Sequence, residues 1–256
     1  GPAFALSTKT GWQVGVIGAG QLGRMMALAG YPLNIRCRFL DREPDAPAAQ
    51  VAPILLGDLS DAGKIAELAA GCDVLTFDWE NVPAAALKGL GGKVPVRPAI
   101  RALSVSQDRL LEKRLFARLG IPVAPHAAID SFEDLRRAAT DIGPQGILKT
   151  RRLGYDGKGQ ARIRSAADLE TAFEKLRGAP LIYERFVPFS HEVSIVAARS
   201  ARGEIRCYPL ARNTHRDGIL RISVAPHIEP AIERRARAAV KKVLEALGYV
   251  GVLAIE

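Results

Sequence analysis

The stretch GILKTRRLGYDGKGQARI, residues 146–163, contains two short apolar segments on either side of a glycine-rich segment. GILKT and QARI have the composition of short β-strands, and the segment between them contains Gly154, Gly157 and Gly159. Because a strand, a loop and a strand follow one another without a helix, the stretch predicts a β-hairpin with a glycine-rich loop.

The residues of this loop indicate a lid that covers a bound polyphosphate. Glycines allow the backbone to approach phosphate oxygens with its N–H groups, while Lys149 and Lys158 supply positive charge. Such a lid excludes water during phosphoryl transfer. A P-loop is not predicted, because that motif needs a helix after the loop and a serine or threonine after its lysine. The alternative is an ordinary exposed Asp-Gly turn.

The segments around the hairpin predict an α+β domain. PLIYERFV, HEVSIVAARS, EIRCYPLA and YVGVLAIE indicate strands, and AADLETAFEKLRG and PAIERRARAAVKKVLEALG indicate helices. SQDRLLEKRLFARLG and SFEDLRRAATDIG are amphipathic helices, the second with Ser131 as N-cap and Asp134 three residues on. Consecutive strands with few helices between them predict an antiparallel sheet with helices to one side.

The first part of the chain predicts an α/β domain. WQVGVIGAGQLGRMMALAG, residues 12–30, indicates a strand, a glycine turn and a helix, and NIRCRFLD indicates the next strand. A helix capped by Ser60 or Asp61 and a strand from Val74 to Phe77 continue the pattern. This alternation predicts a parallel sheet. We expect domains over 13–104 and 105–256, and we set residues 1–12 apart as an extension or tag remnant.

GAGQLG has the G-x-G-x-x-G spacing at Gly18, Gly20 and Gly23. Such a turn brings backbone N–H groups and the positive end of a helix against a phosphate. Asp41, at the end of the second strand, could hold the ribose of NAD. The motif alone leaves three interpretations open: a phosphate site, a dinucleotide site, or glycines that only allow close packing.

Asp78 and Glu80 follow a predicted parallel strand, at the end where open α/β sheets bind ligands. Their alternation places both carboxylates on one side and Trp79 on the other. The pair could bind substrate amines, or it could be a solvated strand end before a helix starting at Pro83.

Composition excludes several classes of protein. The net charge is +9, but the basic residues are scattered and only 6% of residues are aromatic, so we expect phosphorylated anions as ligands and no nucleic-acid partner. Three cysteines without C-x-x-C spacing predict neither a disulfide framework nor a zinc site, and we expect a cytoplasmic protein. No apolar run approaches the ~20 residues that cross a bilayer, so no membrane is expected.

Six segments, in order and spacing, resemble the N5-carboxyaminoimidazole ribonucleotide synthetases, an ATP-grasp family of bacterial and fungal purine synthesis. The segments are GAGQLGRM, TFDWENVPA, SQDRLLEKRLFARLGIP, ILKTRRLGYDGKGQ, YERFVPFSHEVSIV and NTHRDGILRISVAP. The resemblance runs from about Gln13 to Glu256. It implies a Rossmann-like preATP-grasp domain with a parallel sheet, and then an ATP-grasp domain with antiparallel sheets and a lid subdomain over about 127–187.

The resemblance also implies roles for individual residues. Lys149, Tyr155 and Asp156 are expected at the reacting groups. Gly20, Gln21, Leu22 and Glu80 are expected to bind the ribonucleotide substrate, and Glu256 a magnesium ion. The expected ATP-binding residues are Arg109, Lys149, Gly154, Tyr155, Asp156, Gly157, Lys158, Gly159, Gln160, Glu184, Arg185, Phe186, Val187, Glu192 and His215.

The implied reaction is the ATP-dependent carboxylation of 5-aminoimidazole ribonucleotide with bicarbonate, through carboxyphosphate, with ATP and Mg²⁺ as cofactors. Family members continue beyond the position of Glu256 with a second acidic metal ligand and a small C-terminal domain, which this sequence lacks. We therefore expect a truncated form with weak or no activity, and a homodimer for the full-length protein.

Three alternatives remain at this stage: another ATP-grasp carboxylase or ligase of purine synthesis, an NAD(P)-dependent oxidoreductase, and a nucleotide-binding module without catalysis. The ATP-grasp interpretation predicts that Lys149→Ala removes most ATP affinity with little loss of stability.

Overall fold

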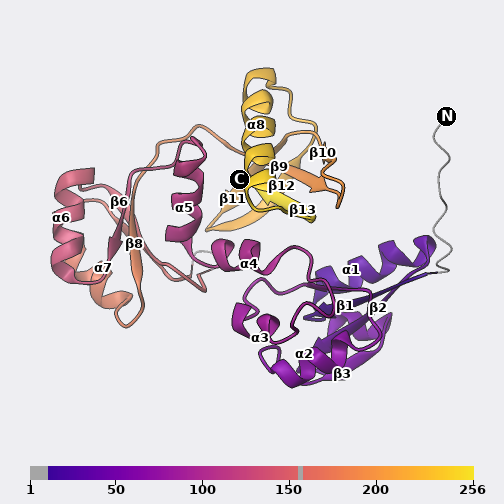
Figure 1. Ribbon diagram of the computed structural model, residues 1–256. Coiled ribbons are helices and arrows are strands. Elements are labelled where there is room, and N and C mark those ends of the chain that lie inside the picture. Colours follow the sequence, from indigo (N-terminus) through magenta and orange to yellow (C-terminus); the bar gives the residue numbers. More distant parts are fainter. Residues whose placement is uncertain (1–10, 155–157) are drawn as a thin grey trace. The chain divides into compact units, whose positions relative to one another are not determined.

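The computed structural model describes residues 11–154 and 158–256. Its contacts divide the chain into two units, Gly1–Leu103 and Ser104–Glu256, which we describe separately (Figure 1). Tyr155, Asp156 and Gly157, to which the sequence assigns roles, lie outside the described residues.

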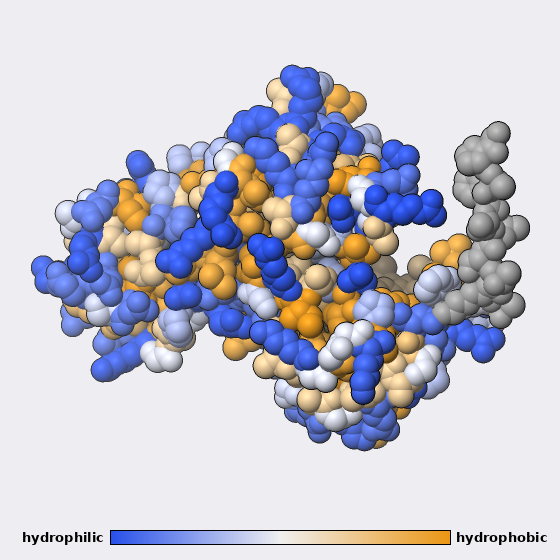
Figure 2. Space-filling model, viewed as in Figure 1, coloured by the Kyte–Doolittle hydropathy of each residue, from blue (hydrophilic) through white to orange (hydrophobic). Residues whose placement is uncertain are grey.

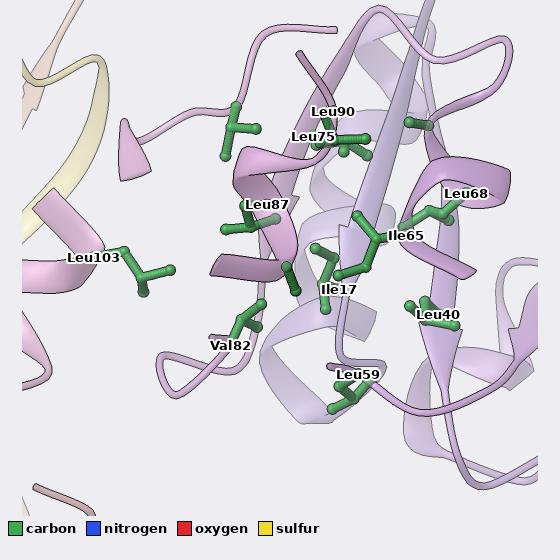
Figure 3. Packing of buried hydrophobic residues seen from close by; sticks show 13 residues of the cluster. Ile17, Leu40, Leu59, Ile65, Leu68, Leu75, Val82, Leu87, Leu90 and Leu103 are labelled. Atoms are coloured by element: carbon green, nitrogen blue, oxygen red, sulfur yellow. The ribbon is translucent and has the colours of Figure 1, made fainter. Parts of the chain in front are cut away.

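Unit 1 is built on a parallel sheet with the strand order β3-β2-β1-β4. Because side chains alternate along the central strands, Val16 and Phe39 pack on the face of α1, while Ile17 and Leu40 pack against α2 and α3 on the other face (Figure 3). This doubly covered parallel sheet confirms the predicted α/β class. Its strands are β1 (Trp12–Ile17), β2 (Ile35–Asp41), β3 (Ile54–Leu56) and β4 (Val74–Phe77). Its helices are α1 (Gln21–Gly30), α2 (Ala62–Ala69), α3 (Ala84–Lys88) and the short 3₁₀ turns η1 (Tyr31–Leu33) and η2 (Pro47–Gln50).

Helix α4 (Ile100–Ser106) leads from unit 1 into unit 2, which has two antiparallel sheets. The first sheet has the order β5-β8-β6-β7, and α6 and α7 cover one of its faces around a core that includes Leu135, Leu148 and Tyr183. Its elements are α5 (Arg109–Arg118), β5 (His126–Ile129), α6 (Phe132–Ile142), β6 (Gly146–Thr150), β7 (Gln160–Ile163), η3 (Ala166–Asp168), α7 (Leu169–Lys175) and β8 (Leu181–Arg185). Strands β6 and β7 are the predicted hairpin, paired antiparallel from Gly146 opposite Ile163 to Lys149 opposite Gln160.

The second sheet has the order β10-β9-β11-β12, with β13 also paired to β9. Helix α8 lies beside β9 and β13 (Figure 1). At the end of this sheet, β12 exposes Leu220, Ile222 and Val224. Its elements are β9 (Glu192–Arg199), β10 (Ile205–Cys207), β11 (Ala211–Arg216), β12 (Ile219–Val224), α8 (Pro230–Ala246) and β13 (Gly251–Ile255).

The surface agrees with the dispersed charge of the sequence. Hydrophilic residues are spread over the visible face and interspersed with hydrophobic ones, rather than gathered in one tract (Figure 2). No helix among the described residues is both long and apolar enough to cross a bilayer.

Candidate active site

The glycine turn of unit 1 lies between β1 and α1, where a parallel sheet presents its carboxyl edge. Gly18 has φ +92°, which favours glycine, and an added Cβ would meet the backbone nitrogen of Trp79 at 3.2 Å. Gly20, Gln21 and Leu22 line a hollow of about 530 Å³ beside this turn. The expected ribonucleotide residues of the turn therefore border a space that can hold a small ligand.

Asp41 supports the turn itself. Its Oδ2 accepts the backbone N–H of Ala19 at 2.7 Å, and its Oδ1 accepts the N–H of Glu43 at 3.1 Å. The carboxylate that a dinucleotide would need for its ribose is thus engaged with the protein backbone. This arrangement counts against the NAD(P) interpretation.

The two acidic residues after β4 differ in their surroundings. Asp78 lines the same hollow as Gly20, and its Oδ2 would lie 2.6 Å from a Cβ added at Gly20. Trp79 packs against the core of unit 1. Glu80 is exposed and is not among the residues that line the hollow. Of the two acidic residues after β4, Asp78 is therefore the one beside the hollow, although the sequence assigned Glu80 to the substrate.

A charged cluster occupies the face of the first sheet in unit 2 that α6 and α7 leave uncovered. Alternation along β6 and β8 directs Leu148 and Tyr183 toward the helices, and Lys149 and Glu184 to the other face. Glu184 is only 7% exposed, and its Oε2 lies 3.0 Å from Nζ of Lys149 and 3.4 Å from Nζ of Lys113 on α5. One buried carboxylate thus holds two lysines side by side.

Glu112 adds a further carboxyl to this cluster from α5. Burial raises the pKa of Glu112 above its usual value, and the negative charge of Glu184 acts in the same direction. The positive charges of Lys113, Arg109 and Lys149 oppose this rise without cancelling it. The neighbourhood of Lys149 is therefore dense in charge of both signs.

Arg109 anchors the glycine hairpin to α5. Its Nη1 donates to the carbonyl of Thr150 at 3.2 Å and its Nη2 to the carbonyl of Gly154 at 2.9 Å. Within the loop, Gly159 has φ +70°, its carbonyl accepts the N–H of Thr150 at 2.8 Å, and Lys158 is exposed. The expected phosphate contacts Arg109 and Lys149 are therefore both tied to the base of this hairpin.

The expected adenine hinge, Glu184 to Val187, covers the end of β8 and the two residues after it. Arg185 and Val187 are exposed, and the guanidinium of Arg162 lies 4.2 Å from the ring centre of Phe186. The N–H of Phe186 donates to the carbonyl of Gln145 at 3.0 Å, which fixes the backbone of the hinge.

Glu192 and His215 come together although 23 residues separate them. Oε2 of Glu192 lies 2.7 Å from Nδ1 of His215, across the paired strands β9 and β11. On its other side, the pairing of β11 with β12 has a register shift between Thr214 and His215, and such bulges reorient side chains. The carboxylate and the imidazole are both partly exposed, so a ligand can reach them.

Glu256 follows β13 directly and is exposed. A carboxylate is a suitable magnesium ligand, because Mg²⁺ is usually held by one or two carboxylates together with waters and substrate phosphates.

The sequence did not predict the parts of Asp108, Glu112, Lys113 and Arg151 in this region. Lys113 pairs with Glu184, and Asp108 pairs with Arg151 at 2.8 Å at the start of α5. The spacing of Arg109, Glu112 and Lys113 along one helix was an available signal, because residues three and four apart share a face. Their partners could not be found from the sequence, because Glu184 and Arg151 lie in distant segments that only the fold brings to α5.

Known proteins match both parts of the chain. A model of the ribonucleotide synthetase preATP-grasp domain matches residues 12–107, and one of the ATP-grasp domain matches residues 114–256. The N5-carboxyaminoimidazole ribonucleotide synthase of Pseudomonas aeruginosa is 48% identical over 244 residues, 95% of this chain and 68% of that protein. The chain belongs to the N5-carboxyaminoimidazole ribonucleotide synthase family.

Solved structures of this synthase family agree with the fold. The synthetase of Thermus thermophilus matches with a TM-score of 0.89 and 44% identity, covering 94% of this chain and 66% of that one. A synthase from Aspergillus clavatus, in complex with ADP and 5-aminoimidazole ribonucleotide, matches with a TM-score of 0.87 and 27% identity, covering 96% and 65%. The chain spans about two thirds of the length of these relatives. As a member of the synthase family it is an ATP-grasp ligase, with the predicted order of a parallel-sheet domain and an antiparallel-sheet domain.

Proposed function

We propose that this chain binds Mg-ATP and 5-aminoimidazole ribonucleotide and carries out the ATP-dependent carboxylation of the ribonucleotide with bicarbonate. The observation that carries the proposal is the pair of lysines held by buried Glu184, beside a glycine hairpin that Arg109 anchors. Two ammonium groups and a guanidinium at the base of a glycine lid form a cationic surface suited to a polyphosphate.

In this proposal bicarbonate attacks the γ-phosphorus of ATP, ADP leaves, and carboxyphosphate forms. The exocyclic amine of the ribonucleotide then attacks the carboxyl carbon, phosphate leaves, and the amine loses a proton. Phosphoryl transfer needs little covalent help from a protein, so catalysis depends on positioning and charge. Lys149 and Arg109 would hold the phosphates, and the lid of residues 154–160 would exclude water.

The other proposed contacts of ATP and the ribonucleotide are assigned to individual elements. The hinge of Glu184 to Val187 would receive adenine along its backbone, and Glu192, oriented by His215, would accept hydrogen bonds from the ribose hydroxyls. In unit 1, the turn of Gly20, Gln21 and Leu22 would hold the 5′-phosphate of the ribonucleotide at the start of α1. Glu80, Tyr155 and Asp156 are proposed at the ribonucleotide or bicarbonate.

We further propose Mg²⁺ as the cation, a homodimer for the full-length protein and the cytoplasm as its compartment. Glu256 would hold the ion together with the nucleotide phosphates. When bound, the ion supplies neutralisation of the charge on the polyphosphate.

The direct test is calorimetric titration of the chain with Mg-ATP and, separately, with NADPH. Saturable binding of Mg-ATP without binding of NADPH is the expected result. Binding of NADPH alone would overturn the proposal and return the glycine turn to a dinucleotide role. A second arm measures ADP formation with and without 5-aminoimidazole ribonucleotide, since another amine as the stimulating substrate would indicate a different ATP-grasp ligase.

Lys149→Ala tests the phosphate contact. Hydrogen bonds to charged groups contribute about 1.5–3 kcal/mol, so we expect Mg-ATP to bind about 10- to 100-fold more weakly. Lys241→Ala, which removes an exposed lysine near Glu245, is the matched control and should bind as the parent does. Equal affinity in Lys149→Ala and Lys241→Ala would contradict the assignment.

The structure also changes the loss of folding stability that we expect for Lys149→Ala. The sequence predicts little loss, but Lys149 is paired with buried Glu184. Breaking a buried pair costs about 3–5 kcal/mol when the remaining charge has no partner. Because Glu184 keeps Lys113, we expect a measurable loss below that range.

A further inference from the structure

Two histidines and a glutamate in segments next to the second sheet of unit 2 lie close together. His191 lies directly before β9, and His227 and Glu229 lie in the segment between β12 and α8. Nε2 of His191 is 3.4 Å from Oε1 of Glu229, and Nε2 of His227 is 3.3 Å from the same oxygen. The ligand atoms of the three side chains all lie within 4.8 Å of one another. Over residues 11–154 and 158–256, no other group of three such side chains converges in this way.

Hydrogen bonding within the protein does not account for this arrangement. Nε2 of His227 is buried and has no hydrogen-bond partner among the described residues, although it lies close to the glutamate oxygen. Buried polar atoms are normally satisfied, and an exception calls for a partner such as an ion. The two imidazole rings meet edge to face, with centroids 5.5 Å apart.

The hydroxyl of Ser190 orients one of the rings. It lies 2.9 Å from Nδ1 of His191 and can accept the proton of that nitrogen. With the proton on Nδ1, Nε2 of His191 carries a lone pair and, at 3.4 Å from Oε1 of Glu229, can bind the same cation as that oxygen. Histidine ligands of metals commonly donate their second N–H to an oxygen in this way.

The distances match the coordination shell of a first-row divalent cation. Bonds of about 2.0–2.1 Å to imidazole nitrogen and carboxylate oxygen, in tetrahedral geometry, place neighbouring ligand atoms about 3.3 Å apart. The two nitrogen to oxygen distances are 3.4 and 3.3 Å. We propose that His191, His227 and Glu229 bind a divalent cation of the zinc type, with water at the remaining position.

None of the three proposed ligands is among the residues proposed to bind nucleotide, although His191 directly precedes Glu192 in the chain. Glu229 is the N-cap of α8, and the N–H of His227 donates to the carbonyl of Leu210 at 2.7 Å. The backbone of these two proposed ligands is therefore held in place. A bound ion would fasten the start of α8 and the preceding loop to the start of β9. Its role is therefore structural, and we expect binding to raise the midpoint of thermal unfolding.

The experiment titrates the chelator-treated full chain with Zn²⁺ by calorimetry. We expect one ion per chain, and an affinity at least about tenfold lower in His191→Gln and in His227→Gln. His126→Gln is the matched control, since Nδ1 of His126 lies beside the carbonyl of Ala124 and takes no part in the cluster. The parent and this control should gain thermal stability with Zn²⁺, whereas the two cluster variants should not.

Co²⁺ identifies the donor atoms as well as the stoichiometry. Nitrogen and oxygen ligands predict a visible spectrum of tetrahedral Co²⁺ without the near-ultraviolet absorption of thiolate ligation, which the three cysteines could otherwise produce. His215→Gln removes the imidazole beside Glu192 and should leave this spectrum unchanged. Absence of saturable binding, or full binding in both cluster variants, would overturn the proposal. If His227→Gln does not fold, His191→Gln and Glu229→Gln provide the same comparison.

Discussion

Asp108 has two tasks at the start of α5. Its Oδ1 accepts the N–H groups of Leu110 and Leu111 at 2.9 and 3.3 Å, which caps the helix, and its Oδ2 accepts from Nη2 of Arg151 at 2.8 Å. Burial raises the pKa of Asp108, but these hydrogen bonds outweigh it and lower the pKa below its ordinary value. The carboxylate therefore stabilises the folded chain in its charged form.

Asp108→Asn keeps a side chain that can cap α5 but removes the negative charge that pairs with Arg151. Asparagine also caps helices, so we expect a loss of about 1 kcal/mol at pH 7, mainly from the weaker bond to Arg151. Because the folded pKa is lowered, the charged carboxylate stabilises the protein above the unfolded pKa of about 3.9, and this contribution disappears as pH falls through the folded value. Urea unfolding of both proteins from pH 7 downward should show the difference closing below about pH 4.

Asp108→Ala is the companion variant, because it also removes the cap. We expect an additional loss of about 1 kcal/mol that persists at low pH. A difference between parent and Asp108→Asn that stays constant with pH would contradict the role assigned to the charge.

Residues of the site differed in how far the sequence could predict them. Arg109, Lys149 and Glu192 are assigned to the proposed site through motifs whose order resembles a known family. The partners of these residues depend on pairing: Glu184 meets Lys149 because β6 and β8 align Lys149 with Ile182, which leaves Glu184 on the diagonal. The spacing of residues within one strand does not show how that strand aligns with its neighbour.

At the scale of elements, the glycine hairpin depends on Gly159. Its φ of +70° lies in the left-handed region, and an added Cβ would lie 2.7 Å from Oγ1 of Thr150. We expect Gly159→Ala to cost about 1–2 kcal/mol from backbone strain, to lose further stability from the contact, and to weaken Mg-ATP binding.

Gly178→Ala is the matched control for this element. Gly178 has φ +95°, but an added Cβ would meet nothing within 4 Å. It should therefore show the strain alone, with Mg-ATP affinity unchanged. Thermal unfolding and ATP titration of both variants make the comparison, and equal effects on affinity would argue against a role for the hairpin in binding.

Elements with strong local signals were predicted, and weakly patterned ones were not. Ser131 and Asp134 form the expected capping box of α6, and Asp61 rather than Ser60 caps α2. Strands β3, β5, β11 and β12 and helix α4 were missed. The sequence ARNTHR of β11 is polar at most positions, and it becomes a strand because β9 and β12 flank it.

At the scale of the whole molecule, the two units have separate cores, which can be perturbed one at a time. Leu135 is fully buried in unit 2 and Leu68 in unit 1, and replacing either by alanine should cost about 2–5 kcal/mol. The two tryptophans of the sequence, Trp12 and Trp79, both belong to unit 1. Tryptophan fluorescence therefore reports unit 1, while circular dichroism reports both units.

We expect Leu135→Ala to shift the dichroism transition in urea to lower concentration and to leave the fluorescence transition in place. Leu68→Ala should shift the fluorescence transition instead. Mg-ATP should protect the part of the dichroism transition that belongs to unit 2. If each variant shifted both signals equally, the chain would unfold as one cooperative unit.

Strand β12 has a consequence for how copies of the chain behave together. Among the described strands it pairs with β11 alone, and its Leu220, Ile222 and Val224 are exposed. An apolar edge strand offers hydrogen bonds and contact area to a strand of another molecule. At low ionic strength the net charge of +9 keeps molecules apart, but the Debye length falls to about 8 Å at physiological salt. Added salt usually releases basic proteins from anionic surfaces. Here it should instead promote association of these molecules with one another through β12.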